Sequence, residues 1–444
     1  MRKITWTFWL TFATVTLVWV MPDNPFPPLA TVFSLRQVWI QYTGLMAIAA
    51  MTIALVLANR PRQLEKPLGG LDKTYRLHKW LGVAGLIFAV AHWLLVKGVQ
   101  WAVGWSWIAS PARGQRPPVT SAVEQWLRTF RGFAETVGEY AFYAAVVLIV
   151  LALIRQFPYR WFAKTHKWLA VLYFALAFHA VVLLRIGYWR APAGILVTVL
   201  LATGIVSAVR VLGGRVGAER KVEGHIESLT WYPELSVLQT TIDMQPGWPG
   251  HASGQFAFVT SDRDEGAHPY TIASAWDPRL PQVVFFTKDL GDHTSRLKHY
   301  LKIGMPVTVE GPYGCFTFAD QRAHQIWIGA GIGITPFIAR MKELALHPDR
   351  RHRIDLFHTT ADFSQKAIDQ LVADADAAEV RLHLLVDSKH GRLNGARIRT
   401  AVPDWASASV WFCGPPGFGE SLCTDLVAHG LDEADFHQEL FHMR

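Results

Sequence analysis

The sequence predicts a multi-domain membrane protein: an all-α bundle of six transmembrane helices, then an antiparallel β-barrel, then an α/β doubly wound domain. Three observations support this prediction. The chain is 51% hydrophobic, but its long apolar runs are concentrated between residue 1 and about residue 212. The next hundred residues alternate short β-rich runs with Gly/Pro turns, which is typical of a small barrel. From His324 onward strands alternate with helical segments, which is typical of a parallel sheet. We place the domains at 1–220, 221–322 and 323–444.

Six apolar stretches are long enough to span a bilayer, which requires about 20 residues. The first lacks an A-x-A-like cleavage site, so we interpret it as a retained helix and not as a signal peptide. With the N-terminus in the cytoplasm, the inside segments carry 16 Lys and Arg in 49 residues, and the outside segments carry 8 in 62. This asymmetry follows the positive-inside rule and places both termini in the cytoplasm. The stretches run near 4–21, 37–58, 77–96, 137–154, 168–184 and 192–209.

The charge and the cysteines exclude other classes of protein. The net charge of +8 does not indicate nucleic-acid binding, because the basic residues lie mostly in short loops between apolar runs. The three cysteines form no CxxC pair, so neither a zinc site nor a disulfide framework is indicated. The first apolar run begins at Ile4 and the chain has no calcium-binding loop motif. We therefore expect constitutive activity without an obligatory protein partner.

Two related apolar segments, "RLHKWLGVAGLIFAVAHW" and "KTHKWLAVLYFALAFHAV", each hold two histidines. Fourteen residues of α-helix rise about 21 Å and return to within about 40° of the same face. His78 and His92 therefore lie on one stripe at two depths. The third and fifth spans run in the same direction, so His166 matches His78 in depth and His179 matches His92. Two facing imidazoles at each depth indicate a bis-histidine haem site, repeated at two depths.

The second spacing does not fit a regular helix. Thirteen residues leave His166 and His179 about 140° apart, so we expect a kink, a π-bulge or a different haem tilt. The alternative to haem ligation is that the four histidines are polar contacts between helices. We favour ligation, because ionisable groups in lipid are costly and usually functional.

Five motifs follow in the two C-terminal domains. "HPYTIAS" ends a barrel strand, where an aromatic ring and hydroxyls can hold a flat ligand. "KDLGDHT" places Gly291 and Thr294 at the start of a helix, where a phosphate can bind. "EGPYG" is a tight turn that ends the barrel. In "GAGIGITP" a glycine loop follows a strand, with Thr335 expected as N-cap and Pro336 as the first helical residue. Such a loop lets a pyrophosphate approach the backbone.

The fifth motif, "CGPPGF", follows the last strand of the α/β domain. It therefore lies at the carboxyl edge of the sheet, where ligands of such sheets bind. Cys413 could reach a nicotinamide ring from this position. The alternative is that Cys413 is a buried structural thiol.

Taken in order, the five motifs resemble the ferredoxin-NADP reductase-like flavoprotein module. Together with the six spans and the histidine spacings, the whole chain resembles the NADPH oxidase and ferric reductase superfamily, and its layout resembles the minimal bacterial NADPH oxidases. The resemblance implies FAD, two b-type haems and NADPH or NADH as cofactors, and the bacterial inner membrane as the location. The sequence differs from many soluble members of this family at His268, where they carry an arginine.

The resemblance also implies roles for individual residues. The haem ligands would be His78, His92, His166 and His179. The FAD ring and ribityl chain would contact His268, Pro269, Tyr270 and Thr271, with Ser274 and Gly311 completing this site. The FAD phosphates would be held by Lys288, Gly291 and Thr294. The nucleotide pyrophosphate would contact Gly329, Gly331, Gly333, Thr335 and Pro336, and the nicotinamide pocket would be lined by Cys413, Gly414 and Pro415. The expected catalytic residues are Cys413 and Phe441. The ring of Phe441 would stack on the flavin.

The implied activity is that of a transmembrane NAD(P)H oxidase, which moves electrons from cytoplasmic NAD(P)H through FAD and two haems to extracytoplasmic O2, giving superoxide. Three alternatives stay open: reduction of ferric or cupric chelates by the same wiring, an electron relay to a periplasmic partner or quinone, and a membrane anchor without haem. The residues that would read the extra phosphate of NADPH should follow the second strand of the last domain, where the sequence offers Thr359, Thr360 and Lys366, with Arg392 in a later loop. These residues include no decisive pair of arginines; we favour NADPH, with NADH as the alternative. The expected partners are membrane lipid, NAD(P)H and the electron acceptor, and no nucleic acid.

Overall fold

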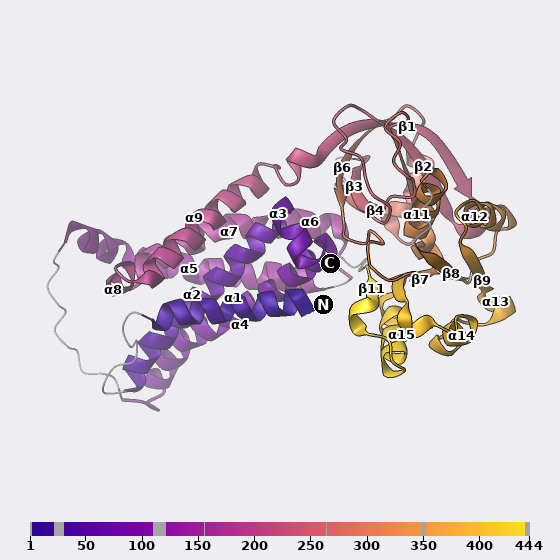
Figure 1. Ribbon diagram of the computed structural model, residues 1–444. Coiled ribbons are helices and arrows are strands. Elements are labelled where there is room, and N and C mark those ends of the chain that lie inside the picture. The colour runs from indigo at the N-terminus through magenta and orange to yellow at the C-terminus, as the bar shows by residue number, and fades with distance from the viewer. Residues whose placement is uncertain are drawn as a thin grey trace. The chain divides into compact units, whose positions relative to one another are not determined.

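The computed structural model describes residues 2–21, 31–109, 121–154, 156–262, 264–347 and 352–439. The chain divides into two compact units (Figure 1). Unit 1 contains Met1–Leu68 and Lys73–Val216, and unit 2 contains Gly69–Asp72 and Gly217–Met443. The described part of unit 1 is helical, and unit 2 holds both β-sheets.

The described part of unit 1 consists mainly of long apolar helices. Among the described residues, six helical segments are long and apolar enough to cross a membrane, and α6 and α7 together make one of them. These segments are the predicted spans, extended at several ends. The helices are α1 (Arg2–Val20), α2 (Val32–Ala58), α3 (Arg62–Leu68), α4 (Leu71–Gly104), α5 (Ala122–Leu153), α6 (Tyr159–His166), α7 (Trp168–Leu183), α8 (Ile186–Trp189) and α9 (Pro192–Leu212).

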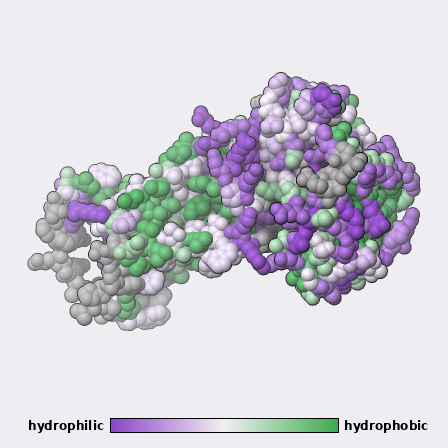
Figure 2. Space-filling model, in the orientation of Figure 1, coloured by the Kyte–Doolittle hydropathy of each residue, from purple (hydrophilic) through white to green (hydrophobic). Residues whose placement is uncertain are grey.

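The surface of unit 1 is apolar. Figure 2 shows hydrophobic residues gathered over its helices. Large apolar side chains on all six spans are more than half exposed, whereas water-soluble proteins rarely expose a large continuous apolar surface. The chain is therefore a multi-pass membrane protein. These side chains include Trp6, Trp9, Ile87, Val147, Ile195 and Val206.

The first sheet of unit 2 is an antiparallel barrel, as predicted. Its strands follow the order β4-β3-β6-β1-β2-β5, and an antiparallel bridge between Ile272 and Phe285 connects the two ends. Helix α10 (Asp292–Tyr300) lies between β5 and β6 in the chain. The strands are β1 (Lys221–Tyr232), β2 (Val237–Met244), β3 (Phe256–Thr260), β4 (His268–Thr271), β5 (Gln282–Lys288) and β6 (Pro306–Tyr313).

The second sheet of unit 2 is parallel, with the order β11-β10-β7-β8-β9. Alternate residues of its strands pack into two hydrophobic clusters, one with α11 and α12 and the other with α14 and α15. Helices therefore cover both faces, which makes the domain doubly wound as predicted. The elements are β7 (His324–Ala330), α11 (Thr335–Leu346), β8 (Arg353–Thr360), α12 (Gln365–Ala377), β9 (Arg381–Val386), α13 (Asp387–His390), α14 (Gly395–Ala401), β10 (Ser409–Cys413), α15 (Pro416–Ala428) and β11 (Phe436–Gln438).

The strand order of this sheet reverses beside β7. Strands β8 and β9 extend from one side of β7, and β10 and β11 extend from the other. Ligands of such sheets bind at the carboxyl ends of the strands where the order reverses. The candidate nucleotide site therefore lies where β7 and β10 end.

Candidate functional site

The four histidines of unit 1 form two pairs. The ring centroids of His78 and His166 are 5.8 Å apart, with ring planes inclined by 67°. Those of His92 and His179 are 6.1 Å apart and inclined by 78°. A metal–imidazole nitrogen bond is about 2 Å long, so two imidazoles that ligate one ion from opposite sides have centroids about 6 Å apart. Both separations fit this arrangement. We call the two sets the 78/166 pair and the 92/179 pair.

Helix α4 is continuous through His78 and His92, whereas the partner histidines are separated by an interruption. His166 is the last residue of α6, His179 lies in α7, and Lys167 between the two helices is a turn residue. A regular helix would leave these two histidines about 140° apart. The interruption after His166 is therefore an irregularity of the kind that the thirteen-residue spacing requires.

Three of the four rings bond to a main-chain carbonyl of a neighbouring helix. Because a carbonyl oxygen only accepts, each Nδ1 donates its proton, which leaves Nε2 as the nitrogen able to bind a metal. Hydrogen bonds of this kind commonly fix the tautomer and orientation of metal-ligating histidines. The side chains present therefore fit two bis-histidine haem sites, and their role as ligands stays a prediction. The bonds are His78 to Ala54 (2.8 Å), His92 to Ile40 (3.0 Å) and His179 to Ala134 (2.9 Å).

In unit 2 the motifs "HPYTIAS" and "KDLGDHT" lie together. His268 begins β4 and His293 lies in the first turn of α10. Their rings are stacked, with centroids 3.7 Å apart and planes 7° apart. The His293 Nε2 lies 3.1 Å from the Tyr270 hydroxyl. His293 therefore joins the two predicted FAD-binding motifs, although the sequence analysis did not assign it a role.

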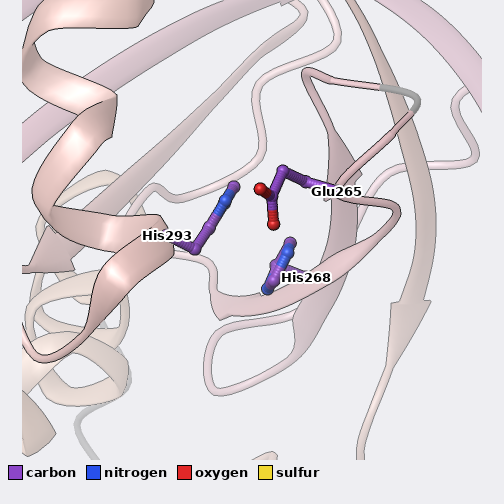
Figure 3. Close-up of side chains that lie close together, drawn as sticks. All are labelled: Glu265, His268 and His293. Carbon is purple, nitrogen blue, oxygen red and sulfur yellow. The ribbon is translucent and has the colours of Figure 1, made fainter. Parts of the chain in front are cut away.

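Figure 3 shows Glu265 beside this stack. One ligand atom from each of Glu265, His268 and His293 lies within 4.8 Å of the other two, so the group could be taken for a metal centre. However, an imidazole lone pair lies in the plane of its own ring. Two stacked and nearly parallel rings cannot direct their lone pairs at the same ion. We therefore interpret the group as an aromatic stack. Burial and, next, His293 lower the pKa of His268 to about 4, which keeps its ring neutral at pH 7.

The predicted phosphate-binding residues lie at the N-terminus of a helix. Gly291 is the N-cap of α10. The Thr294 hydroxyl accepts hydrogen bonds from the main-chain amides of Leu290 (3.0 Å) and Gly291 (3.1 Å). The Lys288 ammonium donates a hydrogen bond to Asp362 in the α/β domain. A bound phosphate would therefore compete with Asp362 for Lys288.

The other predicted flavin contacts lie in or beside the barrel strands. Ser274 is buried, and its hydroxyl accepts a hydrogen bond from the main-chain amide of Val284 (3.1 Å). In β4, Pro269 and Thr271 are paired with residues of β3. Gly311 lies in β6.

The glycine loop after β7 contacts the "CGPPGF" motif after β10. A Cβ atom at Gly333 would lie 2.2 Å from the Cys413 carbonyl oxygen, and one at Gly414 would lie 2.7 Å from the Ala330 Cβ. Gly331 has a φ of +57°, in the left-handed region that favours glycine. The two motifs therefore pack backbone against backbone at the carboxyl ends of β7 and β10. Pro415 is the N-cap of the following helix, α15.

The expected N-cap role of Thr335 is wrong. A short 3₁₀ turn, Gly331–Ile334, leads directly into α11, so Ile334 is the N-cap and Thr335 is already helical. The Thr335 hydroxyl donates to the Ile332 carbonyl (2.7 Å), closing the turn instead of capping the helix. Pro336 is consequently the second helical residue.

Cys413 is fully buried within a hydrophobic cluster. Burial and, next, Glu439 raise the pKa of its thiol well above the ordinary value, so the thiol stays protonated. Glu439 is itself buried close to Gly314 of the "EGPYG" turn; the sequence analysis did not identify it. Phe441 lies outside the described residues.

Residues 43–177 match the family described as ferric reductase like transmembrane component. This segment is a ferric reductase-like transmembrane domain. It includes His78, His92 and His166, and the match ends two residues before His179.

The chain is also similar to several curated reductases and to one oxidase. It is 25% identical over 214 residues to the glycine betaine monooxygenase reductase subunit of Chromohalobacter salexigens, covering 42% of this chain and 55% of that protein. It is 28% identical over 232 residues to respiratory burst oxidase homolog protein E of Arabidopsis thaliana, covering 46% and 23%. It is 27% identical over 177 residues to NADH-cytochrome b5 reductase 2 of Meyerozyma guilliermondii, covering 37% and 60%.

These matches span between about a quarter and three fifths of the relatives' own lengths. A ferric reductase-like membrane domain followed by a ferredoxin-NADP reductase-like module is the layout that the sequence predicted. The comparisons confirm this layout, and the similarity to a respiratory burst oxidase homolog supports the predicted NADPH oxidase and ferric reductase superfamily.

Proposed function

We propose that this chain is a transmembrane NAD(P)H oxidase. In this proposal electrons pass from cytoplasmic NAD(P)H, through FAD and two b-type haems, to O2 on the other side of a bacterial inner membrane, giving superoxide. The observation that carries the proposal is the presence of two histidine pairs at different positions along apolar helices. Each pair has the ring separation expected for two imidazoles that would hold one metal ion between them.

The two pairs provide positions for electron carriers across the apolar part of the membrane. His78 and His92 are fourteen residues apart in one continuous helix, a rise of about 21 Å. This is a large part of a hydrocarbon layer about 30 Å thick. The main-chain carbonyls that accept hydrogen bonds from His78, His92 and His179 hold these three rings in one tautomer, which keeps Nε2 available for iron.

Unit 2 would supply the electrons. The backbone of the loop after β7 and the start of α15 would bind the nucleotide at the carboxyl ends of β7 and β10. Tyr270, the stacked His268 and His293, and the start of α10 would hold the flavin. Bound there, a flavin would supply the conversion between the two-electron hydride chemistry of a nicotinamide and the one-electron chemistry of haem iron. Similarity to two reductases named above supports this assignment.

The pairing of the histidines also bears on the acceptor. Two imidazole ligands on opposite sides leave no open position on a haem iron. The acceptor would therefore be reduced without binding to the iron, which suits the one-electron reduction of O2. The similarity to a respiratory burst oxidase homolog supports this choice. The ferric reductase-like domain favours a second candidate, reduction of ferric or cupric chelates by the same path.

The experiment is NADPH-driven reduction of cytochrome c by the purified, FAD-supplemented chain, with and without superoxide dismutase. We expect two haems per chain by pyridine haemochrome assay and a signal that the dismutase abolishes. A signal that survives, together with anaerobic reduction of a ferric chelate, would favour the second candidate. The variant His92→Ala should lose the signal but keep NADPH-driven flavin reduction. His225→Ala, at an exposed position in β1, is the matched control.

A further inference from the structure

The carbonyl acceptors of the 92/179 pair share one feature of sequence. In an α-helix the carbonyl of residue i already accepts the amide of residue i+4, whose side chain lies close to that carbonyl. The acceptors of His92 and His179 are the carbonyls of Ile40 and Ala134. The residues four positions later are Gly44 and Gly138. At both positions the missing side chain exposes the carbonyl to a second donor.

The His179 ring leaves no room for a side chain at Gly138. A Cβ atom there would lie 2.0 Å from the His179 Nδ1 and 2.5 Å from its Cε1. Ordinary contact begins at 3.4 Å, so an alanine would displace the ring by the difference, about 1.4 Å. At Gly44 the Cβ atom would lie 3.2 Å from the His92 Nδ1 and Cε1. Here a shift of about 0.2 Å restores ordinary contact.

The same arrangement occurs at a third place, away from the histidines. The Tyr173 hydroxyl donates to the Leu200 carbonyl (3.3 Å), and a Cβ atom at Gly204, four residues later, would lie 2.0 Å from that hydroxyl. Water is absent from the apolar interior of a membrane protein, so polar side chains must find protein acceptors. At these three places a glycine at i+4 gives a bulky donor access to a helix carbonyl.

The 78/166 pair differs. Its acceptor is the carbonyl of Ala54, and the residue four positions later is Ala58. A methyl group is thus tolerated beside His78 but not beside His179.

We propose that Gly138 is a positioning residue for the 92/179 haem: it lets His179 bond to the Ala134 carbonyl and thereby present Nε2 to the iron. Gly44 does the same for His92 with more clearance. This inference rests on the proposed function, because it assumes that the pair ligates haem.

The test compares Gly138→Ala with Gly132→Ala in the same helix, where a Cβ atom would meet nothing within 4 Å. The readouts are the haem-to-protein ratio and the low-temperature EPR spectrum of the full-length chain. Loss of an outer hydrogen-bond partner weakens metal binding about 10- to 100-fold. We expect Gly138→Ala to lose about half of the haem and to show the spectrum of His179→Ala, while Gly132→Ala matches wild type.

Two further variants separate a positioning role from a general packing defect. Gly204→Ala makes a clash of equal size at Tyr173 and should retain both haems. If Gly138→Ala does not fold, Gly44→Ala decides: it should keep both haems but shift the EPR signal of one. Wild-type haem content and spectra in Gly138→Ala, or an unshifted Gly44→Ala, would overturn the inference alone. Absence of haem from the wild type would instead overturn the proposed function.

Discussion

Replacement of Gly333 by alanine tests whether the glycine loop after β7 holds the nicotinamide nucleotide. The added Cβ atom would lie 2.2 Å from the Cys413 carbonyl oxygen, whereas ordinary contact begins at 3.4 Å. The Cys413 carbonyl belongs to the backbone, and the position of a Cβ atom is fixed by its own backbone, so neither group can rotate away. The loop after β7 and the end of β10 must therefore separate by the difference, about 1.2 Å.

This displacement acts at the proposed junction of the pyrophosphate and nicotinamide sites. A misplacement of about 1 Å can cost about 100-fold in rate, because reacting groups must be held in a near-attack geometry. That factor corresponds to about 2.7 kcal/mol. We expect NADPH-driven flavin reduction in Gly333→Ala to be about 100-fold slower, with unchanged FAD content and haem spectrum.

The assay is anaerobic stopped-flow flavin reduction by NADPH and, in parallel, by NADH. Gly132→Ala is the control, since Gly132 lies in α5 of unit 1, outside the proposed nucleotide site, and a Cβ atom there would meet nothing within 4 Å. Dithionite should reduce both variants normally, because it does not need the nucleotide site. A Gly333→Ala variant that reacts with NADPH at the wild-type rate would refute the placement of the nucleotide.

Two further predictions concern the stability of unit 2. Burial lowers the pKa of His358 to about 4. Between about pH 6.5 and pH 4 the unfolded chain therefore binds one more proton than the folded chain. The free energy of unfolding decreases as the pH is lowered, by at most about 1.4 kcal/mol per pH unit. His358→Gln should flatten that slope in unfolding experiments at pH 7 and pH 5, and an unchanged slope would contradict the assignment. The buried Asp355 accepts hydrogen bonds from His324 (2.8 Å) and His383 (2.7 Å); Asp355→Asn should destabilise the domain by roughly 3–5 kcal/mol. Asp376→Asn, at an exposed position, is the control and should leave the unfolding midpoint unchanged. Equal midpoints for the two variants would contradict a stabilising role of Asp355 and its two histidine partners.

The fold was predictable where one local pattern determines the structure. Apolar length identifies the membrane spans, and alternating strands and helices identify the doubly wound sheet. Helix ends were less predictable, because composition marks the lipid-facing part and not the hydrogen-bonded ends. The third span, expected at 77–96, extends over Leu71–Gly104. Thr335 was misplaced because a 3₁₀ turn ahead of α11 takes the position of the expected cap.

The candidate site was predictable only in its periodic part. The two histidine pairs follow from the matched depths of the histidines in the two segments, although the thirteen-residue spacing of the second segment does not fit a regular helix. His293 and Glu439 were missed because their environments depend on contacts between distant parts of the chain. His293 stacks on a residue 25 positions earlier, and Glu439 lies near Cys413, 26 positions earlier. No local pattern marks either contact, although a histidine beside a predicted phosphate seat was a usable signal for His293.

The fourteen-residue spacing of His78 and His92 is matched by an equal spacing of the carbonyls that accept their hydrogen bonds. His78 and His92 bond to the carbonyls of Ala54 and Ile40 in α2. These acceptors are also fourteen residues apart, and they run in the opposite direction along the chain. Two antiparallel helices of equal pitch keep such a register only if both spacings match. One residue inserted between Ile40 and Ala54 would rotate one carbonyl by about 100° and separate it from its histidine. The spacing is therefore constrained by the orientation of the rings as well as by the depth of the two sites.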